Sequence, residues 1–219
     1  MISSKGVLKL GDFGLARSSS DPYRAMTHSV ITRWYRPPEL LFGARFYSTA
    51  VDVWSLALVL AELILRVPFL AGNSDVHQVE LICSALGSPT EDVWPGVSTL
   101  PAYAVPDPAT HPIAPRAFWE NMFGSAGPEG VDLLINMLRL DPRKRLSAKE
   151  CLEHAWFRVE PRPTKPERLP RKGGPEGEKK VANDMKRVAG MDSESSGPGS
   201  GPGTGKKTVA RVLDFGGGR

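Results

Sequence analysis

Apolar residues recur at helical spacing in the first half of the chain. Residues 50–66 are apolar on almost every side, which is typical of a helix buried inside a domain. Such a helix needs neighbours all round, and without them one apolar face is exposed. Residues 75–86 repeat apolar side chains at intervals of three and four, which predicts an amphipathic helix that ends at Gly87. The repeat consists of Val76, Val79, Ile82 and Leu86.

Two further helices are predicted beyond position 128. Residues 129–139 are amphipathic, and the Asp-Pro pair that follows ends the pattern. Ser147 precedes a predicted helix at 148–156, and Glu150 stands three residues after it, at the spacing of a capping box.

The remaining segments are less regular. Residues 7–10 are short and apolar and predict a strand, whereas residues 18–48 read as mostly loop. Residues 88–128 hold eight prolines, so we expect a long irregular insert with a short helix near 115–122. The pattern as a whole predicts a mainly α fold.

Composition sets the C-terminal part of the 219-residue chain apart. Residues 158–219 carry 14 Lys and Arg against 8 Asp and Glu, whereas residues 1–157 carry 14 against 16. Gly, Pro and Ser dominate there, and apolar residues are too few for a core. We therefore expect residues 159–219 to form a disordered, basic Pro/Gly-rich tail. Its cations could contact an acidic partner or nucleic acid, but a solvated linker is favoured, and we expect no direct nucleic-acid binding.

Several classes of protein are excluded. Cys83 and Cys151 stand in no metal-binding or redox spacing, which argues against a disulfide scaffold and a zinc site. No signal peptide is recognisable, and no apolar stretch reaches the roughly 20 residues that span a bilayer. We expect a soluble protein of a reducing compartment with no membrane partner.

One short motif carries candidate chemistry. Asp12-Phe13-Gly14 follows the predicted strand, but the same triplet recurs at 214–216 in the glycine-rich tail, so the triplet alone is a weak signal. The first copy gains weight from the Arg-Pro-Pro-Glu run at 36–39, in which Pro37 lies 23 positions after Gly14. This spacing is the one that a protein kinase activation segment requires.

The surrounding sequence resembles one kinase family. Residues 27–36 (THSVITRWYR) are similar to the activation segment of cyclin-dependent kinases. The runs LLFGAR at 40–45 and LRVPFLAGNSD at 65–75 resemble the cyclin-H-dependent kinases of general transcription factor TFIIH that activate other cyclin-dependent kinases. The resemblance extends from Gly6 to about Val105 and more loosely to Phe157.

This resemblance implies a partial protein-kinase-like fold. Residues 1–158 would form the lower, helical part of the C-lobe from the Asp-Phe-Gly strand onward. The activation segment would span 12–39 and the insert 88–128, followed by the tail at 159–219.

The resemblance also implies residues for phosphate and metal chemistry. Asp12 would bind the magnesium ion that bridges the ATP phosphates. Thr27 would be the activating phosphorylation site, and Arg17 would bind its phosphate. In the absence of the resemblance, Thr27 would read as an ordinary loop threonine and Arg17 as a solvated charge.

Other residues would position the substrate or anchor the fold. Thr32 would position the substrate hydroxyl, and Ile31 and Arg36 would shape the pocket that favours proline after the target residue. The anchors would be Asp52, which would accept hydrogen bonds from the catalytic-loop backbone, and the buried ion pair of Glu39 with Arg145. The alternatives are that Arg36 is a solvated surface charge, that Asp52 merely caps its helix, and that Glu39 and Arg145 are unrelated surface charges.

Much of a kinase active site has no counterpart in this sequence. We find no glycine-rich loop, no strand lysine with a helix glutamate, and no His-Arg-Asp loop with its catalytic Asp and metal-binding Asn. ATP and Mg²⁺ are therefore implied by family, and we expect this polypeptide alone to bind them poorly and to lack kinase activity.

The family also implies partners and a location. The implied partners are a cyclin of the H type and a RING-finger assembly subunit. The implied substrates are other cyclin-dependent kinases and the C-terminal repeats of RNA polymerase II. The implied location is the nucleus. Two alternatives remain open: a non-catalytic docking fragment or degenerate kinase copy, and another proline-directed kinase of the same group. The runs at 40–45 and 65–75 argue against the second.

Overall fold

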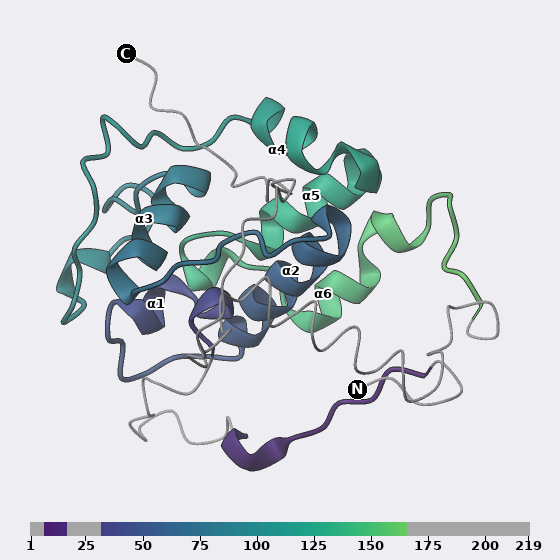
Figure 1. Ribbon diagram of the computed structural model, residues 1–219, viewed down its shortest axis with the longest axis horizontal. Coiled ribbons are helices and arrows are strands. Elements are labelled where there is room, and N and C mark those ends of the chain that lie inside the picture. The colour runs from purple at the N-terminus through teal and green to yellow at the C-terminus, as the bar shows by residue number, and fades with distance from the viewer. Residues whose placement is uncertain (1–6, 17–31, 166–219) are drawn as a thin grey trace, which may run out of the picture. The chain divides into compact units, whose positions relative to one another are not determined.

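The computed structural model describes residues 7–16 and 32–165 of the chain (Figure 1). It divides the chain into two compact units. One is Gly14–Arg162, and the other combines Met1–Phe13 with Pro163–Arg219. The tail expected to be disordered lies, from 166 onward, outside the described residues.

The strand expected at residues 7–10 is wrong. This segment contains one isolated bridge residue, Leu8, and no strand. Leu8 and Leu10 are exposed. A strand is stable only when a second strand accepts and donates its backbone hydrogen bonds, and the described part of the chain offers none.

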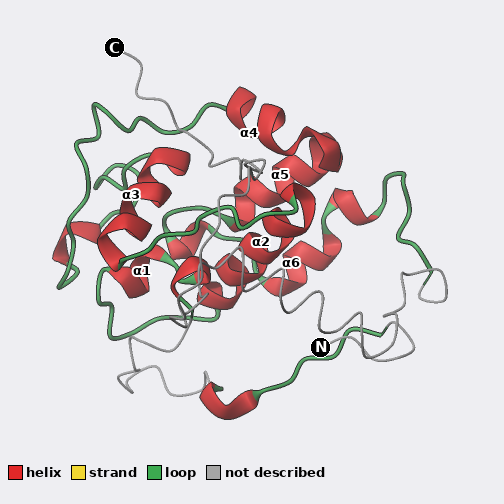
Figure 2. Ribbon diagram, in the orientation of Figure 1, coloured by secondary structure: helices red, strands yellow, loops and turns green. Residues whose placement is uncertain are grey.

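The unit Gly14–Arg162 is built from helices, as the sequence predicts (Figure 2). α2 lies centrally and contacts both α5 and α4, while α1 contacts α3 (Figure 1). No helix of the described residues is both long and apolar enough to cross a membrane. The α-helices are α1 (Pro38–Leu41), α2 (Ala50–Leu65), α3 (Asp75–Leu86), α4 (Arg116–Phe123), α5 (Gly127–Met137) and α6 (Ala148–Glu153).

The helix expected at 50–66 is confirmed as α2, which ends one residue earlier, at Leu65. Its exposed apolar face is confirmed as well. One side of α2 is buried, including Trp54 and Ala57, which are fully inaccessible to solvent. Leu56, Val59 and Leu63, spaced by three and four residues, are exposed to 58%, 43% and 68%. We call these three side chains the α2 stripe.

The helix expected at 75–86 is confirmed residue for residue as α3. Ser74 caps its start by accepting a hydrogen bond from the backbone N–H of His77 (3.1 Å). Gly87 ends it with φ +96°, a backbone angle that favours glycine. Val76, expected on the buried face, is exposed. It sits in the first turn at the edge of that face, which instead includes the buried polar residue Gln78.

The short helix expected near 115–122 is confirmed as α4. Two of its aromatic residues, Trp119 and Phe123, pack against Phe69, with Phe69 and Phe123 ring centroids 5.1 Å apart. α5 begins and ends two residues earlier than the expected 129–139. Pro128, which suits the first turn of a helix, accounts for the earlier start.

The helix expected at 148–156 is shorter than predicted. α6 ends at Glu153, and His154 adopts extended backbone before a short 3₁₀ turn, Ala155–Phe157. The capping box is present, since Ser147 and Glu150 exchange hydrogen bonds between side chain and backbone N–H. Both cysteines are buried and unpaired, and burial raises the pKa of Cys83 to about 11, so its thiol stays protonated at neutral pH.

Candidate functional site

Glu39 and Arg145 form a buried, bidentate ion pair. Each Nη atom of Arg145 donates to one carboxylate oxygen of Glu39, both at 2.7 Å. The two side chains are 4% and 0% exposed. Glu39 lies in the first turn of α1 and Arg145 follows the 3₁₀ turn Pro142–Lys144, so the pair joins segments 106 residues apart.

All five N–H groups of the Arg145 guanidinium have acceptors. Besides Glu39, they donate to the backbone carbonyls of Arg139 (2.8 Å), Ala50 (3.0 Å) and Leu140 (3.3 Å). A buried charge is tolerated only when paired and hydrogen-bonded in this way. Removing one partner of such a pair costs about 3–5 kcal/mol, because the other charge is left buried alone.

The chain just before α1 is fixed by contacts to α2 and α3. Residues Arg33–Tyr35 form a 3₁₀ turn. The Tyr35 hydroxyl donates to Glu62 Oε2 of α2 (2.7 Å), and the Tyr35 carbonyl accepts from Ser55 Oγ (2.9 Å). Burial, followed by the hydrogen bond and the charge of Glu62, raises the pKa of Tyr35 to about 12. The turn is therefore held by a neutral phenol at all physiological pH values.

A buried amide links the same turn to α3. Gln78 is fully buried; its Nε2 donates to the carbonyl of Leu70 (3.2 Å), and its Oε1 accepts from Gly72 N–H (2.9 Å). Gly72 in turn accepts the indole N–H of Trp34 at 3.1 Å. A Cβ on Gly72 would lie 2.6–2.7 Å from Gln78, so only glycine allows this approach.

Asp75 pairs with two arginines of the segment. Its Oδ1 accepts from Arg33 Nε at 2.7 Å and from Arg36 Nη1 at 3.3 Å. Asp75 is 56% exposed, and exposed ion pairs contribute only about 0–1 kcal/mol. The pair therefore orients Arg36 but stabilises the fold far less than Glu39 with Arg145.

Thr32 and Asp52 are both exposed. Thr32 precedes the 3₁₀ turn, and its hydroxyl makes no hydrogen bond within the described residues. Asp52 lies in the first turn of α2, but the helix is preceded by Thr49, so Asp52 is not its N-cap. The capping alternative is therefore wrong. Asp52 continues the α2 stripe toward the start of the helix.

The remaining candidates divide into two groups. Asp12, in the smaller unit, is exposed and has φ +62°, an unusual left-handed conformation that Asp tolerates better than most residues. The described residues contain no cluster of acidic, His or Cys side chains that could hold a metal without help. Arg17, Thr27 and Ile31 lie outside the described residues.

Sequence reasoning missed the residues that hold the 32–36 segment in place. They are Glu62, Asp75 and Gln78. Gln78 had a detectable signal, because a polar residue four positions before Ile82 falls on the buried face of the helix. Glu62 and Asp75 had none, since each sits where a surface charge is ordinary.

Comparison with known protein families shows the family to which the chain belongs. A model of the protein kinase domain matches residues 1–157, which is more than half of the chain. The chain belongs to the protein kinase family.

The chain is also similar to individual members of this family. The chain is 48% identical to the serine/threonine-protein kinase crk1 of Schizosaccharomyces pombe, over 85% of this chain and 55% of that protein. It is 46% identical to cyclin-dependent kinase 7 of Carassius auratus, over 78% and 48%. A solved CAK complex from Chaetomium thermophilum, bound to ATP-gamma-S, contains a chain that is 55% identical, with a TM-score of 0.75 over 78% of this chain and 53% of that one. The chain spans about half the length of these relatives.

Proposed function

We propose that this chain is the C-terminal half of the catalytic domain of a nuclear Ser/Thr kinase of the CDK-activating type. The observation that carries the proposal is the fixed segment 32–39. It is locked by the buried ion pair of Glu39 with Arg145, and it leaves the Thr32 hydroxyl exposed. A segment that is held in one conformation beside an exposed hydroxyl suits the positioning of a peptide substrate.

The roles of individual residues follow from the family resemblance. Thr32 positions the substrate hydroxyl, and Ile31 and Arg36 favour proline after the target residue. The ion pair of Arg36 with Asp75 supports its role, because it holds the guanidinium in one orientation. Asp52 anchors the catalytic loop of the complete kinase.

Nucleotide and metal binding rest on fewer groups. Asp12 would hold Mg²⁺, since Mg²⁺ is often bound by one or two carboxylates together with substrate phosphates. Phosphorylated Thr27, paired with Arg17, would order the activation segment. Bound ATP supplies the phosphoryl group, and the metal offsets its charge. Since one carboxylate cannot position ATP, we expect no turnover by this chain alone.

The implied partners are those of the family. A cyclin of the H type and a RING-finger assembly subunit would bind the complete kinase, and its substrates would be other cyclin-dependent kinases and the polymerase C-terminal repeats. The α2 stripe favours a second function, a non-catalytic docking fragment, because three exposed apolar side chains on one helix face suit a partner.

A chimera tests the proposal. Residues 1–157 replace the matching part of fission-yeast crk1, and phosphorylation of polymerase repeats is measured. We expect activity that is abolished by Asp12→Asn and strongly reduced by Thr32→Ala, while the exposed control Thr99→Ala leaves it unchanged. A folded chimera that phosphorylates no member of a Ser/Thr substrate panel would contradict the kinase proposal. Turnover by the isolated chain above that of its Asp12→Ala variant would contradict the predicted inactivity.

A further inference from the structure

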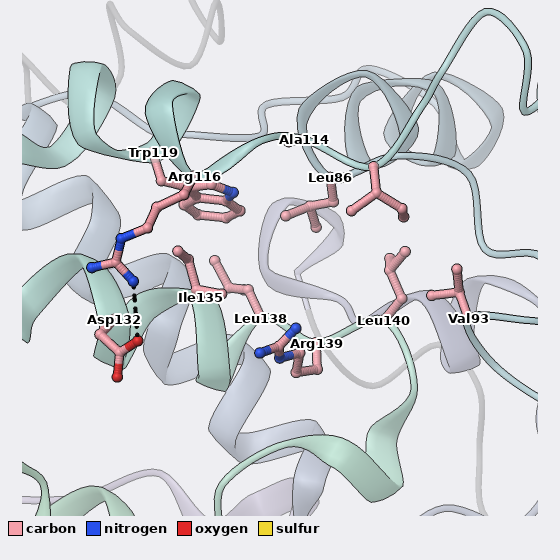
Figure 3. Close-up of a pocket in the computed structure, with 11 residues that line it drawn as sticks. Leu86, Val93, Ala114, Arg116, Trp119, Asp132, Ile135, Leu138, Arg139 and Leu140 are labelled. Carbon is pink, nitrogen blue, oxygen red and sulfur yellow. Dashed lines mark hydrogen bonds and ion pairs between the residues drawn. The ribbon is translucent and has the colours of Figure 1, made fainter.

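An apolar pocket opens between the end of α3, the segment before α4, and α5 (Figure 3). Its volume is about 260 Å³. Apolar side chains of α3, α4, α5 and the residues just after α5 line it: Leu86, Trp119, Ile135, Leu138 and Leu140. The volume lies below the range of roughly 300–1,000 Å³ typical of small-molecule sites, so the pocket suits an inserted side chain better than a metabolite.

An exposed apolar residue extends the pocket toward solvent. Ile113 lines the pocket and is 53% exposed. It is the residue that a Cβ on Gly87 would meet at 2.6 Å, so the chain at 113 is packed tightly against the end of α3. Ile113 therefore offers a fixed apolar contact beside the pocket.

The charges around the pocket are unbalanced. Two arginines and one aspartate line it. Arg116 pairs with Asp132 at 3.4 Å, as the dashed line in Figure 3 shows, and with Glu120 at 2.8 Å, so its charge is compensated. Within the part of the chain that the structure describes, the Arg139 side chain donates only to the amide oxygen of Asn136 (3.0 Å).

A second cation lies beside the pocket. Lys144 donates its Nζ proton to the carbonyl of Val93, a lining residue, at 3.0 Å. Among the described residues, neither Arg139 nor Lys144 has a carboxylate within ion-pair distance. The charge of Lys144 also acts on the carboxylate of Asp141 and is partly compensated, whereas the Arg139 side chain, among the described residues, donates to the Asn136 amide alone.

We propose that this pocket docks an acidic peptide segment of another protein. One large apolar side chain of the segment enters the pocket, and flanking carboxylates pair with Arg139 and Lys144. Apolar anchoring supplies affinity, and charge complementarity selects the partner and speeds association. The site is separate from the segment 32–39.

The Arg139 side chain is a suitable position for a test. Its backbone carbonyl accepts a hydrogen bond from the buried Arg145, but its side chain is exposed and donates to Asn136, outside the buried pair. Arg139→Glu therefore changes the pocket's charge without touching the buried ion pair. Arg45→Glu is the matched control, since Arg45 is an exposed arginine outside the pocket.

The experiment uses the full chain and a short fluorescein-labelled peptide with a Leu-Phe pair flanked by glutamates. Two matched peptides carry lysines in place of the glutamates, or alanines in place of Leu-Phe. Binding is followed by fluorescence anisotropy. We expect the acidic Leu-Phe peptide to bind, both matched peptides to bind at least about tenfold more weakly, and added salt to weaken binding.

The variants decide whether the pocket is the site. Arg139→Glu should weaken binding of the acidic peptide about tenfold or more and strengthen binding of the lysine peptide. Ile113→Ser should weaken binding of the acidic peptide, because it removes an apolar contact beside the pocket. Stronger binding of the lysine peptide by Arg139→Glu also shows that this variant is folded, because an unfolded variant would not gain affinity for a new peptide. The proposal fails if no peptide binds, if the alanine peptide binds equally well, or if Arg45→Glu has the same effect as Arg139→Glu.

Discussion

The guanidinium carbon of Arg145 lies 4.8 Å from the centre of the Trp54 ring, and that indole is fully buried. Arg145 thus stacks on the central helix α2 while its N–H groups reach Glu39 and three backbone carbonyls. A planar, five-donor group is required for this combination, and lysine cannot replace it.

Arg145→Lys should therefore be strongly destabilising. A lysine ammonium can reach only some of the acceptors, which leaves Glu39 partly unpaired and the Trp54 face without its stacked cation. We expect the free energy of unfolding in urea to fall by about 3 kcal/mol. The control is Arg162→Lys in an exposed pair with Glu160, where we expect less than about 1 kcal/mol. Equal losses of unfolding free energy in the two variants would contradict the claim that the buried bidentate pair requires arginine.

Glu62→Gln should lower the pKa of Tyr35 from about 12 toward its ordinary value near 10. Glutamine keeps the size of the side chain but removes its charge. Because the folded-state pKa is raised, the stabilisation by neutral Tyr35 is complete below about pH 10 and is lost as pH rises through about 12. The wild-type protein should therefore lose stability across this window more steeply than Glu62→Gln.

Phenolate absorbance measures the Tyr35 ionisation directly. The chain has four tyrosines, so the Tyr35 signal is obtained by subtracting the titration of Tyr35→Phe. A Tyr35 titration that is the same with Glu or Gln at position 62 would mean that Glu62 has no influence on it.

Gly72→Ala should destabilise the contact between the 32–36 turn and α3. The new Cβ would lie 2.7 Å from the Gln78 backbone, so the two segments must separate. We expect a loss of about 1–3 kcal/mol in thermal or urea unfolding. Gly124→Ala is the matched control, because Gly124 has helical backbone angles and nothing within 4 Å of its Cβ position. It should be neutral or slightly stabilising, and a similar loss in both variants would contradict the steric argument.

Leu63→Lys should reduce self-association. Leu63 is the most exposed member of the α2 stripe, and a cation in the last turn of a helix interacts favourably with the helix dipole. We expect less light scattering at equal concentration and unchanged helical circular dichroism. Leu58→Lys, at a position only 2% exposed, should instead unfold the protein. Scattering that does not change in Leu63→Lys would rule out the stripe as the source of association.

The helices were predictable from the sequence to the extent that local signals specify them. α3 was predicted residue for residue from its apolar repeat and from Gly87, which ends it with left-handed backbone; the structure adds Ser74 as the cap of its start. α6 was predicted too long, since nothing in the local pattern shows that His154 turns its ring back to accept the N–H of Trp156. The strand at 7–10 was wrong because a strand depends on a partner that the segment itself does not encode.

The site was less accessible to sequence reasoning. Residues of the motif could be named, but the contacts that fix them come from distant segments, such as Asp75 with Arg33 and Glu62 with Tyr35. Charged residues at surface spacing carry no local sign of such pairing. The family resemblance supplied Glu39 and Arg145, whereas Gln78 had only the weak local signal of a polar residue on the apolar face predicted for 75–86.

The 106-residue separation of Glu39 and Arg145 has a consequence for protein synthesis. Glu39 leaves the ribosome long before Arg145, and at roughly 5–20 residues per second the interval is on the order of 5–20 seconds. During that interval an acidic side chain destined for the interior has no cation to meet, so the early helices cannot settle into their final packing. The first helices of the unit therefore complete their packing only after the last part of the unit has been synthesised. Nascent chains stalled before residue 145 are the ones that chaperones would have to bind.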